Sequence, residues 1–314
     1  MVGEERIPNK QAVQLKTLGT MEINYSIIIP HHNESALLQR LLSTIPNRAD
    51  LEIIVVDDAS TENEVKELTK LENSRSDLKI IYHNTNIGGG GARNIGLSFA
   101  SGRYVIFSDS DDFFLPSLNK KLEQYRNYSA DLIVFNAISL DSEKYLNSNR
   151  ASHLNSLIKR YNKTSRTDEI RYLFGEPWCK FINRKMIQIH NILFDQLPIH
   201  NDTTFSLFVG HYAKNVTIDD TAIYCITERA HSVSKSITLE RIYVRADVFF
   251  KKNIFLQKHK ISFRDRLLIS AFYEMFKMKG IDGIKELNHH LGISLLQSCN
   301  IITQIVIKEI SRIL

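Results

Sequence analysis

The strongest constraint on the fold is an alternation of short apolar runs with segments of helical periodicity in the first third of the chain. The β-branched run 25–29 is followed by a segment, 37–45, whose leucines and isoleucine recur at helical spacing. The runs 51–56 and 78–83 are two further predicted strands, with a predicted helix over 62–71 between them. Strands and helices that alternate at this spacing predict an α/β fold with a mostly parallel sheet and helices on both faces.

The ends of the first strand and helix carry signals of their own. Pro30 is expected to end the first strand because it has no backbone N–H to donate. Asn33 or Ser35 is expected to cap the helix that follows, since both side chains can accept a hydrogen bond from its first turn.

Polar residues gather at the predicted strand ends. His31 to Glu34 follow the first strand, Asp57 and Asp58 follow the second, and Asp109 to Asp112 follow a later apolar run, 104–107. The carboxyl ends of parallel strands share one edge of a sheet, where α/β proteins bind their ligands. Three carboxylates within four residues raise one another's pKa unless a cation neutralises them, and Mg²⁺ or Mn²⁺ suits such ligands. The alternative is a solvated acidic turn.

The stretch from Asn86 to Gly96 contains four consecutive glycines. Glycines let the backbone approach a ligand closely or adopt a positive φ. The stretch lacks the ending of a P-loop and does not fit G-x-G-x-x-G, which argues against an ATPase, a GTPase and a classical dinucleotide enzyme. A flexible surface loop remains the alternative. Arg93, expected at the start of the next helix, carries a guanidinium that suits a diphosphate.

Composition narrows the class of protein. The chain of 314 residues has only three cysteines, which excludes a disulfide framework or a Cys-rich zinc site and suits a reducing cytosol. Residues 1–20 lack the apolar core of a signal peptide, and no uninterrupted apolar run is long enough to predict a membrane-spanning helix. From Glu240 onward there are 13 Lys and Arg against 7 Asp and Glu, so the positive charge is concentrated there.

These motifs, in this order and spacing, resemble the family 2 glycosyltransferases of GT-A fold, in particular the transferases of bacterial capsule and cell-surface polysaccharide. The residues that carry the resemblance lie strongly over 24–138 and more weakly over 170–236. The resemblance implies an inverting, metal-dependent hexosyltransferase that moves a sugar from a nucleotide-sugar, usually a UDP-sugar, to a hydroxyl of a glycan or lipid-linked acceptor. The residues that it assigns to donor binding are Pro30, His32, Glu34, Asp58, Asn86, Arg93, Asp109, Ser110, Arg229 and Ser234.

The resemblance also implies a metal site, a catalytic base and an acceptor side. Mn²⁺ or Mg²⁺ would be held by Asp109 and Asp111, with His231 as a third ligand. Asp202 would be the general base, although Asn201 replaces the glutamate that usually precedes it, and an N-cap of the helix 203–212 is its alternative role. The acceptor side would be lined by Trp178 and Lys180, with ordinary core packing as the alternative for the tryptophan.

The expected organisation is an N-terminal tail over 1–22, a catalytic domain over 23–238 and a helical region over 239–314. The catalytic domain would divide into a nucleotide-sugar half, 23–138, and an acceptor half, 139–238. Near the C-terminus, isoleucines and a valine form an apolar stripe over 301–313 with charges off it. This stripe would be core, a contact between subunits, or a peripheral anchor on anionic lipid.

The expected location is the cytoplasm, with contact to the inner face of the membrane left open. No nucleic-acid partner is expected. Two other classes of function remain as alternatives, a nucleotidyltransferase and a non-catalytic protein that binds sugar nucleotides. A nucleotidyltransferase would need a basic signature loop after the first strand, and residues 31–35 do not supply one.

Overall fold

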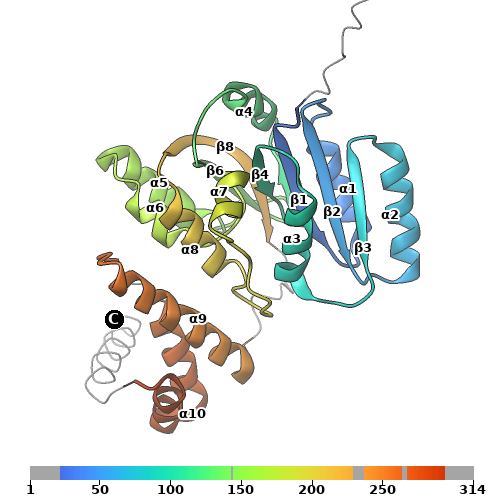
Figure 1. Cartoon of the computed structure of the whole chain (residues 1–314). Coiled ribbons are helices and arrows are strands. Elements are labelled where there is room, and N and C mark those ends of the chain that lie inside the picture. The colour runs from blue at the N-terminus through green and yellow to red at the C-terminus, as the bar shows by residue number, and fades with distance from the viewer. Residues whose placement is uncertain (1–21, 143, 229–236, 264–266, 294–314) are drawn as a thin grey trace, which may run out of the picture.

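The fold is built around one curled sheet of eight strands, shown in Figure 1. The computed structural model describes residues 22–142, 144–228, 237–263 and 267–293. The strands are β1 (Tyr25–His31), β2 (Leu51–Asp58), β3 (Leu78–His83), β4 (Tyr104–Phe107), β5 (Phe113–Phe114), β6 (Leu132–Asp141), β7 (Lys180–Asn183) and β8 (Val216–Glu228). The helices are α1 (Ser35–Thr44), α2 (Glu62–Ser74), α3 (Gly88–Phe99), α4 (Ser117–Tyr125), α5 (Ser152–Thr164), α6 (Asp168–Leu173), α7 (Arg184–Ile189), α8 (Thr203–Tyr212), α9 (Leu239–Lys258) and α10 (Leu267–Leu291).

The sheet order is β3-β2-β1-β4-β7-β6-β8-β5. The half that contains β3, β2, β1 and β4 is parallel throughout, and β6 also pairs with β8 in parallel. Strands β7 and β5 run antiparallel to their neighbours. In Figure 1, α3 lies in front of the parallel strands and α1 lies behind them. The α/β fold with a mostly parallel sheet, predicted from the alternation of elements, is confirmed.

The parallel half is held together by strands that are apolar on both faces. The side chains of Ile27, Ile28 and Ile29 in β1 are fully buried, and Ile53 to Val56 in β2 are almost as deeply enclosed. Such runs are typical of strands that helices cover on both sides. Helix α3 packs against β1 and β2, so the segment that carries the glycines and Arg93 is fixed beside the edge that is predicted to bind a ligand.

Two predictions, on where the first strand ends and on which residue caps the first helix, are wrong. Strand β1 continues through Pro30 to His31, because Pro30 lies beyond the last β1 residue that pairs with β4 and its missing N–H breaks no bond to that strand. Neither Asn33 nor Ser35 caps α1. The carboxylate of Glu64, in α2, instead accepts hydrogen bonds from the backbone N–H groups of Glu34 (3.1 Å) and Ser35 (2.7 Å).

The glycine run is helical, so the alternative of a flexible loop is wrong. Gly88, with a φ of 75°, begins α3, and the three glycines after it form the first turn. Arg93 therefore lies in the second turn of α3 and not at its start. Asp58 fixes the beginning of this helix, because its carboxylate accepts hydrogen bonds from the N–H groups of Ile87 (2.7 Å) and Gly88 (2.8 Å).

Helices α9 and α10 pack on each other around an apolar core of their own, which includes Ile242, Phe249 and Phe272. Helix α9 also contacts α8, and Gly280 produces a kink inside α10 with a φ of 63°. None of the described helices is both long enough and apolar enough to cross a lipid bilayer. The predicted stripe over 301–313, and the predicted site residues Arg229, His231 and Ser234, lie outside the described residues.

Candidate active site

Arg93 joins two segments that are far apart in the sequence. Its guanidinium donates to the carboxylate of Asp109 (2.5 Å), which follows β4, and to Oδ1 of Asn201 (3.1 Å), which precedes α8. The residue is only 8% exposed and its guanidinium lies 5.5 Å from the ring centre of Phe194. This bridge brings the acidic segment and the segment of the predicted base together at one edge of the sheet.

The loop that carries the predicted base is packed tightly onto α3. A Cβ atom on Gly90 would lie 2.1 Å from the backbone oxygen of Asp195, so only glycine allows this approach. Asp195 donates its N–H to the backbone oxygen of Asn201 (3.0 Å), and the Asn201 amide donates to the Leu197 carbonyl (3.3 Å). Asn201, which stands where a glutamate was expected, therefore holds the loop in place and contacts Arg93.

The acidic segment is fixed from β8. The Tyr224 hydroxyl accepts from the N–H of Asp109 (3.0 Å) and lies 3.1 Å from Oγ of Ser108. The carboxylate of Asp112 is buried and accepts from the N–H of Thr227 (2.7 Å). Burial, together with the charges of Asp111 and Asp109, holds the pKa of Asp112 well above its usual range.

The roles of Tyr224 and Thr227 were not predicted from the sequence. Their place beside the acidic segment depends on the pairing of β8 with β5 and β6, which joins residues about a hundred positions apart. The apolar pattern of 216–228 indicates a strand, but it does not indicate which strands are its neighbours.

Two carboxylates at this edge, those of Asp109 and Asp111, are partly exposed and can act as oxygen ligands. Asp109 is at the same time paired with Arg93, whereas the backbone oxygen of Asp111 accepts from Oγ1 of Thr227 (2.6 Å) and from Arg40. Across the described ranges, no group of three His, Cys, Asp or Glu side chains is arranged to hold a metal ion. The predicted third ligand, His231, falls outside those ranges.

Three predicted donor residues lie together beside the start of α3. Nδ1 of His32 lies 2.8 Å from the backbone oxygen of Asp58, and the exposed side chain of Asn86 reaches the same oxygen at 3.4 Å. Asp58 itself is buried and its carboxylate binds the first amides of α3, so its main observed role is to shape this edge.

The other described residues predicted for donor binding, Pro30, Glu34 and Ser110, are all partly buried. Pro30 lies near the end of β1 and Glu34 just before α1. Ser110 lies between Asp109 and Asp111 in the acidic segment. All three therefore follow or end strands at the same edge as His32 and Asp58.

Asp202 stands at the N-cap position of α8, but its side chain forms no cap hydrogen bond. The residue is only partly exposed. Burial raises the pKa of Asp202 to about 6, with Glu176 and Asp109 adding to the rise and Arg93 opposing it. A carboxylate with a raised pKa beside a ligand-binding edge can accept a proton near neutral pH.

The two residues predicted for the acceptor side lie inside the protein. Trp178 is 7% exposed and stacks on Tyr224, with ring centres 6.0 Å apart. Lys180 is 3% exposed, and its Nζ donates to the Phe174 carbonyl (3.0 Å) and to Oγ of Ser206 (3.2 Å). Burial lowers the pKa of Lys180 to about 7, although the nearby charges of Glu176 and Asp202 oppose that shift. Trp178 thus supports Tyr224 from the protein interior, and Lys180 supports α8 through Ser206.

The amino-acid sequence is similar to those of known proteins. The sequence model of the family described as glycosyl transferase family 2 matches residues 26–189. A cholesterol galactosyltransferase of Borreliella burgdorferi is 27% identical over 314 aligned residues, which cover 87% of this chain and 85% of that protein.

The chain also shares its fold with proteins of known structure. Residues 1–349 of Staphylococcus aureus TarS, in complex with UDP-GlcNAc, superpose with a TM-score of 0.60 at 19% identity and cover 90% of this chain and 80% of that one. The mannosyltransferase PcManGT of Pyrobaculum calidifontis, in complex with GDP-Man and Mn²⁺, gives a TM-score of 0.52 at 15% identity and covers 90% and 80%. The fold is therefore of the GT-A type, as the sequence predicted.

Proposed function

Because this chain belongs to glycosyl transferase family 2, we propose that it transfers a sugar from a UDP-sugar to a hydroxyl of a glycan or lipid-linked acceptor. The observation that carries the proposal is the Arg93 bridge between Asp109 and Asn201. It places the acidic segment, which suits a diphosphate and its metal, next to Asp202, which suits a proton acceptor. A transfer between two bound substrates needs both chemistries at one edge.

The donor is proposed to lie along the edge formed by the ends of β1, β2 and β4. The imidazole of His32 is exposed and can stack on the base, while Asp58 and Asn86 offer hydrogen-bond partners to it. Each oxygen of the Asp58 carboxylate accepts one backbone bond and keeps a lone pair for a second donor. Arg93 is proposed to lie beside the diphosphate. The same role is proposed for Arg229 and Ser234, outside the described residues.

A divalent cation fits the donor set of this edge. Mg²⁺ and Mn²⁺ are commonly held by one or two carboxylates together with substrate phosphates, so Asp109 and Asp111 suffice without a third protein ligand. The Mn²⁺ in the PcManGT complex is consistent with this use of a metal. When bound, such an ion neutralises negative charge on the departing diphosphate. Asp111 is the principal ligand in this proposal, and Asp109, which also pairs with Arg93, is the second.

Asp202 is proposed to remove the proton from the acceptor hydroxyl. Its pKa of about 6 leaves the carboxylate mostly ionised at neutral pH, yet basic enough to take a proton as the oxygen attacks. A single attack on the face opposite the departing diphosphate inverts the anomeric carbon and needs no covalent sugar intermediate. The proton ends on the Asp202 carboxylate, and Asn201 and Gly90 keep the loop that carries it in position.

A lipid-linked acceptor is supported by the relative from Borreliella burgdorferi. The name of that protein states that it transfers galactose to cholesterol. An acceptor at a membrane would suit the excess of positive charge after Glu240. We therefore include in the proposal a peripheral contact of this region with the inner, anionic face of the membrane.

A screen of UDP-sugars, with and without Mn²⁺, tests the proposal. We expect at least one UDP-sugar to raise the melting temperature in the presence of Mn²⁺ and to be slowly hydrolysed to UDP. A nucleotidyltransferase would instead transfer the uridylyl group and release a sugar 1-phosphate, and a non-catalytic protein would bind the donor without turnover. Either of those outcomes would contradict the proposed reaction.

A further inference from the structure

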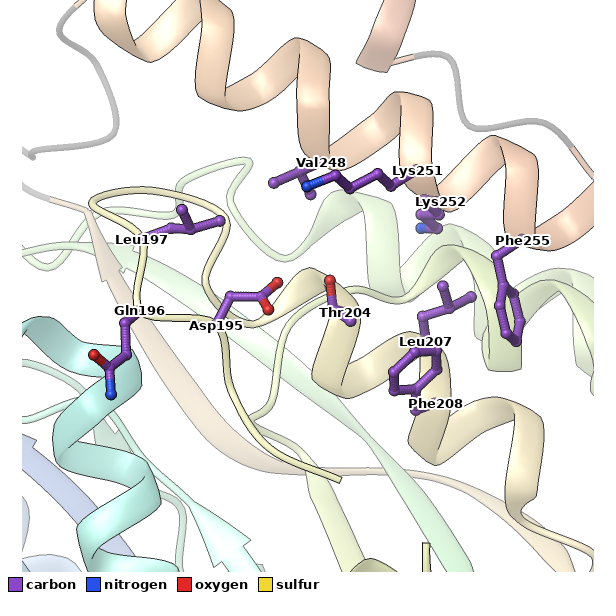
Figure 2. A pocket seen from close by; sticks show the side chains of 10 residues that line it. All are labelled: Asp195, Gln196, Leu197, Thr204, Leu207, Phe208, Val248, Lys251, Lys252 and Phe255. Carbon is purple, nitrogen blue, oxygen red and sulfur yellow. The ribbon is translucent and has the colours of Figure 1, made fainter. Parts of the chain in front are cut away.

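A cavity of about 400 Å³ lies between the loop before α8, helix α8 itself and helix α9, as Figure 2 shows. This volume is within the range of small-molecule binding sites. None of the residues predicted for donor, metal, base or acceptor binding lines it. The lining residues are Asp195, Gln196, Leu197, Thr204, Leu207, Phe208, Val248, Lys251, Lys252 and Phe255.

One side of the cavity is apolar and firmly packed. The rings of Phe208 (α8) and Phe255 (α9) lie 5.4 Å apart, and Leu207 is buried in a cluster with Tyr172 and Leu256. These contacts join α8 and α9 directly, so the apolar wall is fixed by packing on both helices. A wall of this kind binds the apolar part of a ligand through removal of its surface from water.

Two lysines of α9 give the opposite side a positive charge. The side chain of Lys251 is exposed at the cavity, whereas Lys252 is only 4% exposed. Asp195 is the one carboxylate among the lining residues, so the lining carries a net charge of +1. An anionic group is therefore favoured there.

The cavity adjoins the proposed base. Thr204, which lines it, is two residues after Asp202 in the first turn of α8. Asp195, which also lines the cavity, donates its N–H to the backbone oxygen of Asn201 (3.0 Å). A molecule in the cavity thus contacts the same two segments, the loop before α8 and its first turn, that hold Asp202.

We propose that this cavity is the acceptor subsite and that the acceptor is an anionic amphiphile. Its apolar group packs against Leu207, Phe208 and Phe255, its phosphate or equivalent anion lies beside Lys251 and Lys252, and its reacting hydroxyl extends toward Asp202. This inference rests on the proposed function and deepens it, because it assigns to α9 a direct part in the choice of acceptor.

Binding of a simple phosphate amphiphile to the full chain tests this subsite. We expect monododecyl phosphate, below its critical micelle concentration, to bind in a calorimetric titration. Dodecyl maltoside, which lacks the anion, and inorganic phosphate, which lacks the apolar chain, should each bind at least tenfold more weakly. Equal binding of dodecyl maltoside would overturn the role of the lysines, and equal binding of inorganic phosphate would overturn the role of the apolar wall.

Three variants locate the binding. Lys251→Ala should weaken binding of monododecyl phosphate several-fold, and Leu197→Trp should abolish it by filling the cavity from its partly exposed rim. Lys258→Ala, which removes another exposed lysine in the last turn of α9, is the matched control and should change nothing. Equal effects of the two alanine variants, or full binding by Leu197→Trp, would overturn the assignment.

UDP binding, measured on the same samples, separates this inference from the proposed function. All three variants should bind UDP with Mn²⁺ as the wild-type chain does, because none of the altered residues lies at the donor edge. If UDP and every UDP-sugar fail to bind the wild-type chain, the proposed function is wrong. The titration with monododecyl phosphate still measures binding in the cavity, because it does not depend on the donor.

Discussion

We expect the transfer rate to fall in acid with a midpoint near pH 6, because Asp202 must be ionised to accept a proton. With a pKa of about 6, roughly 90% of the carboxylate is ionised at pH 7 and roughly 10% at pH 5. The value of kcat/KM should therefore drop about tenfold between these pH values. A carboxyl group with an ordinary pKa near 4 would still be about 90% ionised at pH 5 and would lose almost no activity.

A neighbouring charge provides the matched test of this cause. Glu176 adds to the raised pKa of Asp202, so Glu176→Gln should lower that pKa and move the acid limb to lower pH. Glu62→Gln, which removes an exposed carboxylate from the first turn of α2, should leave the limb where it is.

The assay is the rate of UDP release over about pH 4.5 to 8, with donor affinity measured in the same buffers. Donor affinity matters because the pKa of Asp112 is also raised, and its protonation acts at the donor edge. A fall in rate centred near pH 4, or one near pH 6 that Glu176→Gln does not move, would show that Asp202 is not the group that titrates. A limb that appears only in donor affinity would assign it to the acidic segment and not to the base.

Asp111, Lys180 and the positively charged region after Glu240 can each be tested separately. Asp111→Asn should abolish Mn²⁺-dependent binding of UDP and the transfer reaction while the melting temperature stays within a few degrees; undiminished turnover under controlled metal concentration would contradict its assignment. The lowered pKa of Lys180 means that the unfolded chain binds more protons than the folded one between about pH 7 and 10, so this group makes the free energy of unfolding rise with pH. Lys180→Met should remove that rise, which denaturant titrations at pH 7 and 10 would show, and an unchanged slope would mean that the buried amine is not neutralised. The full chain should bind anionic liposomes in low salt and be released by about 0.5 M salt, where charge screening is short-ranged; salt-resistant binding to neutral vesicles as well would contradict an electrostatic contact.

Strands and helices could be predicted from the sequence where the pattern of apolar residues within one short segment determines them. The runs 25–29, 51–56 and 78–83 became β1, β2 and β3, and the helix expected over 203–212 is α8. The predictions that failed depended on partners elsewhere in the chain. Glu64 of α2 caps α1, and the glycines of α3 form a helix because Asp58 binds its first amides and Asp195 packs closely on Gly90.

The site could be predicted in its residue types but not in its connections. The sequence indicated Arg93, Asp109 and Asp202 as separate features, and the structure shows that Arg93 and Asn201 join them. No local pattern could reveal Tyr224 beside Asp109, since strand neighbours in the second half of the sheet are set by long-range pairing. The burial of Lys180 and the cavity against α9 likewise arise only from packing between helices.

Asp202→Asn tests the central claim most directly, with transfer rate and donor affinity measured on one preparation. The substitution keeps the size of the side chain and removes its ability to take a proton. We predict a loss of kcat by at least two to three orders of magnitude, within the range of general-base catalysis, with the affinity for UDP and the UDP-sugar nearly unchanged. Retained turnover would show that Asp202 is not the base, and a collapse of donor affinity would place it in the nucleotide site instead.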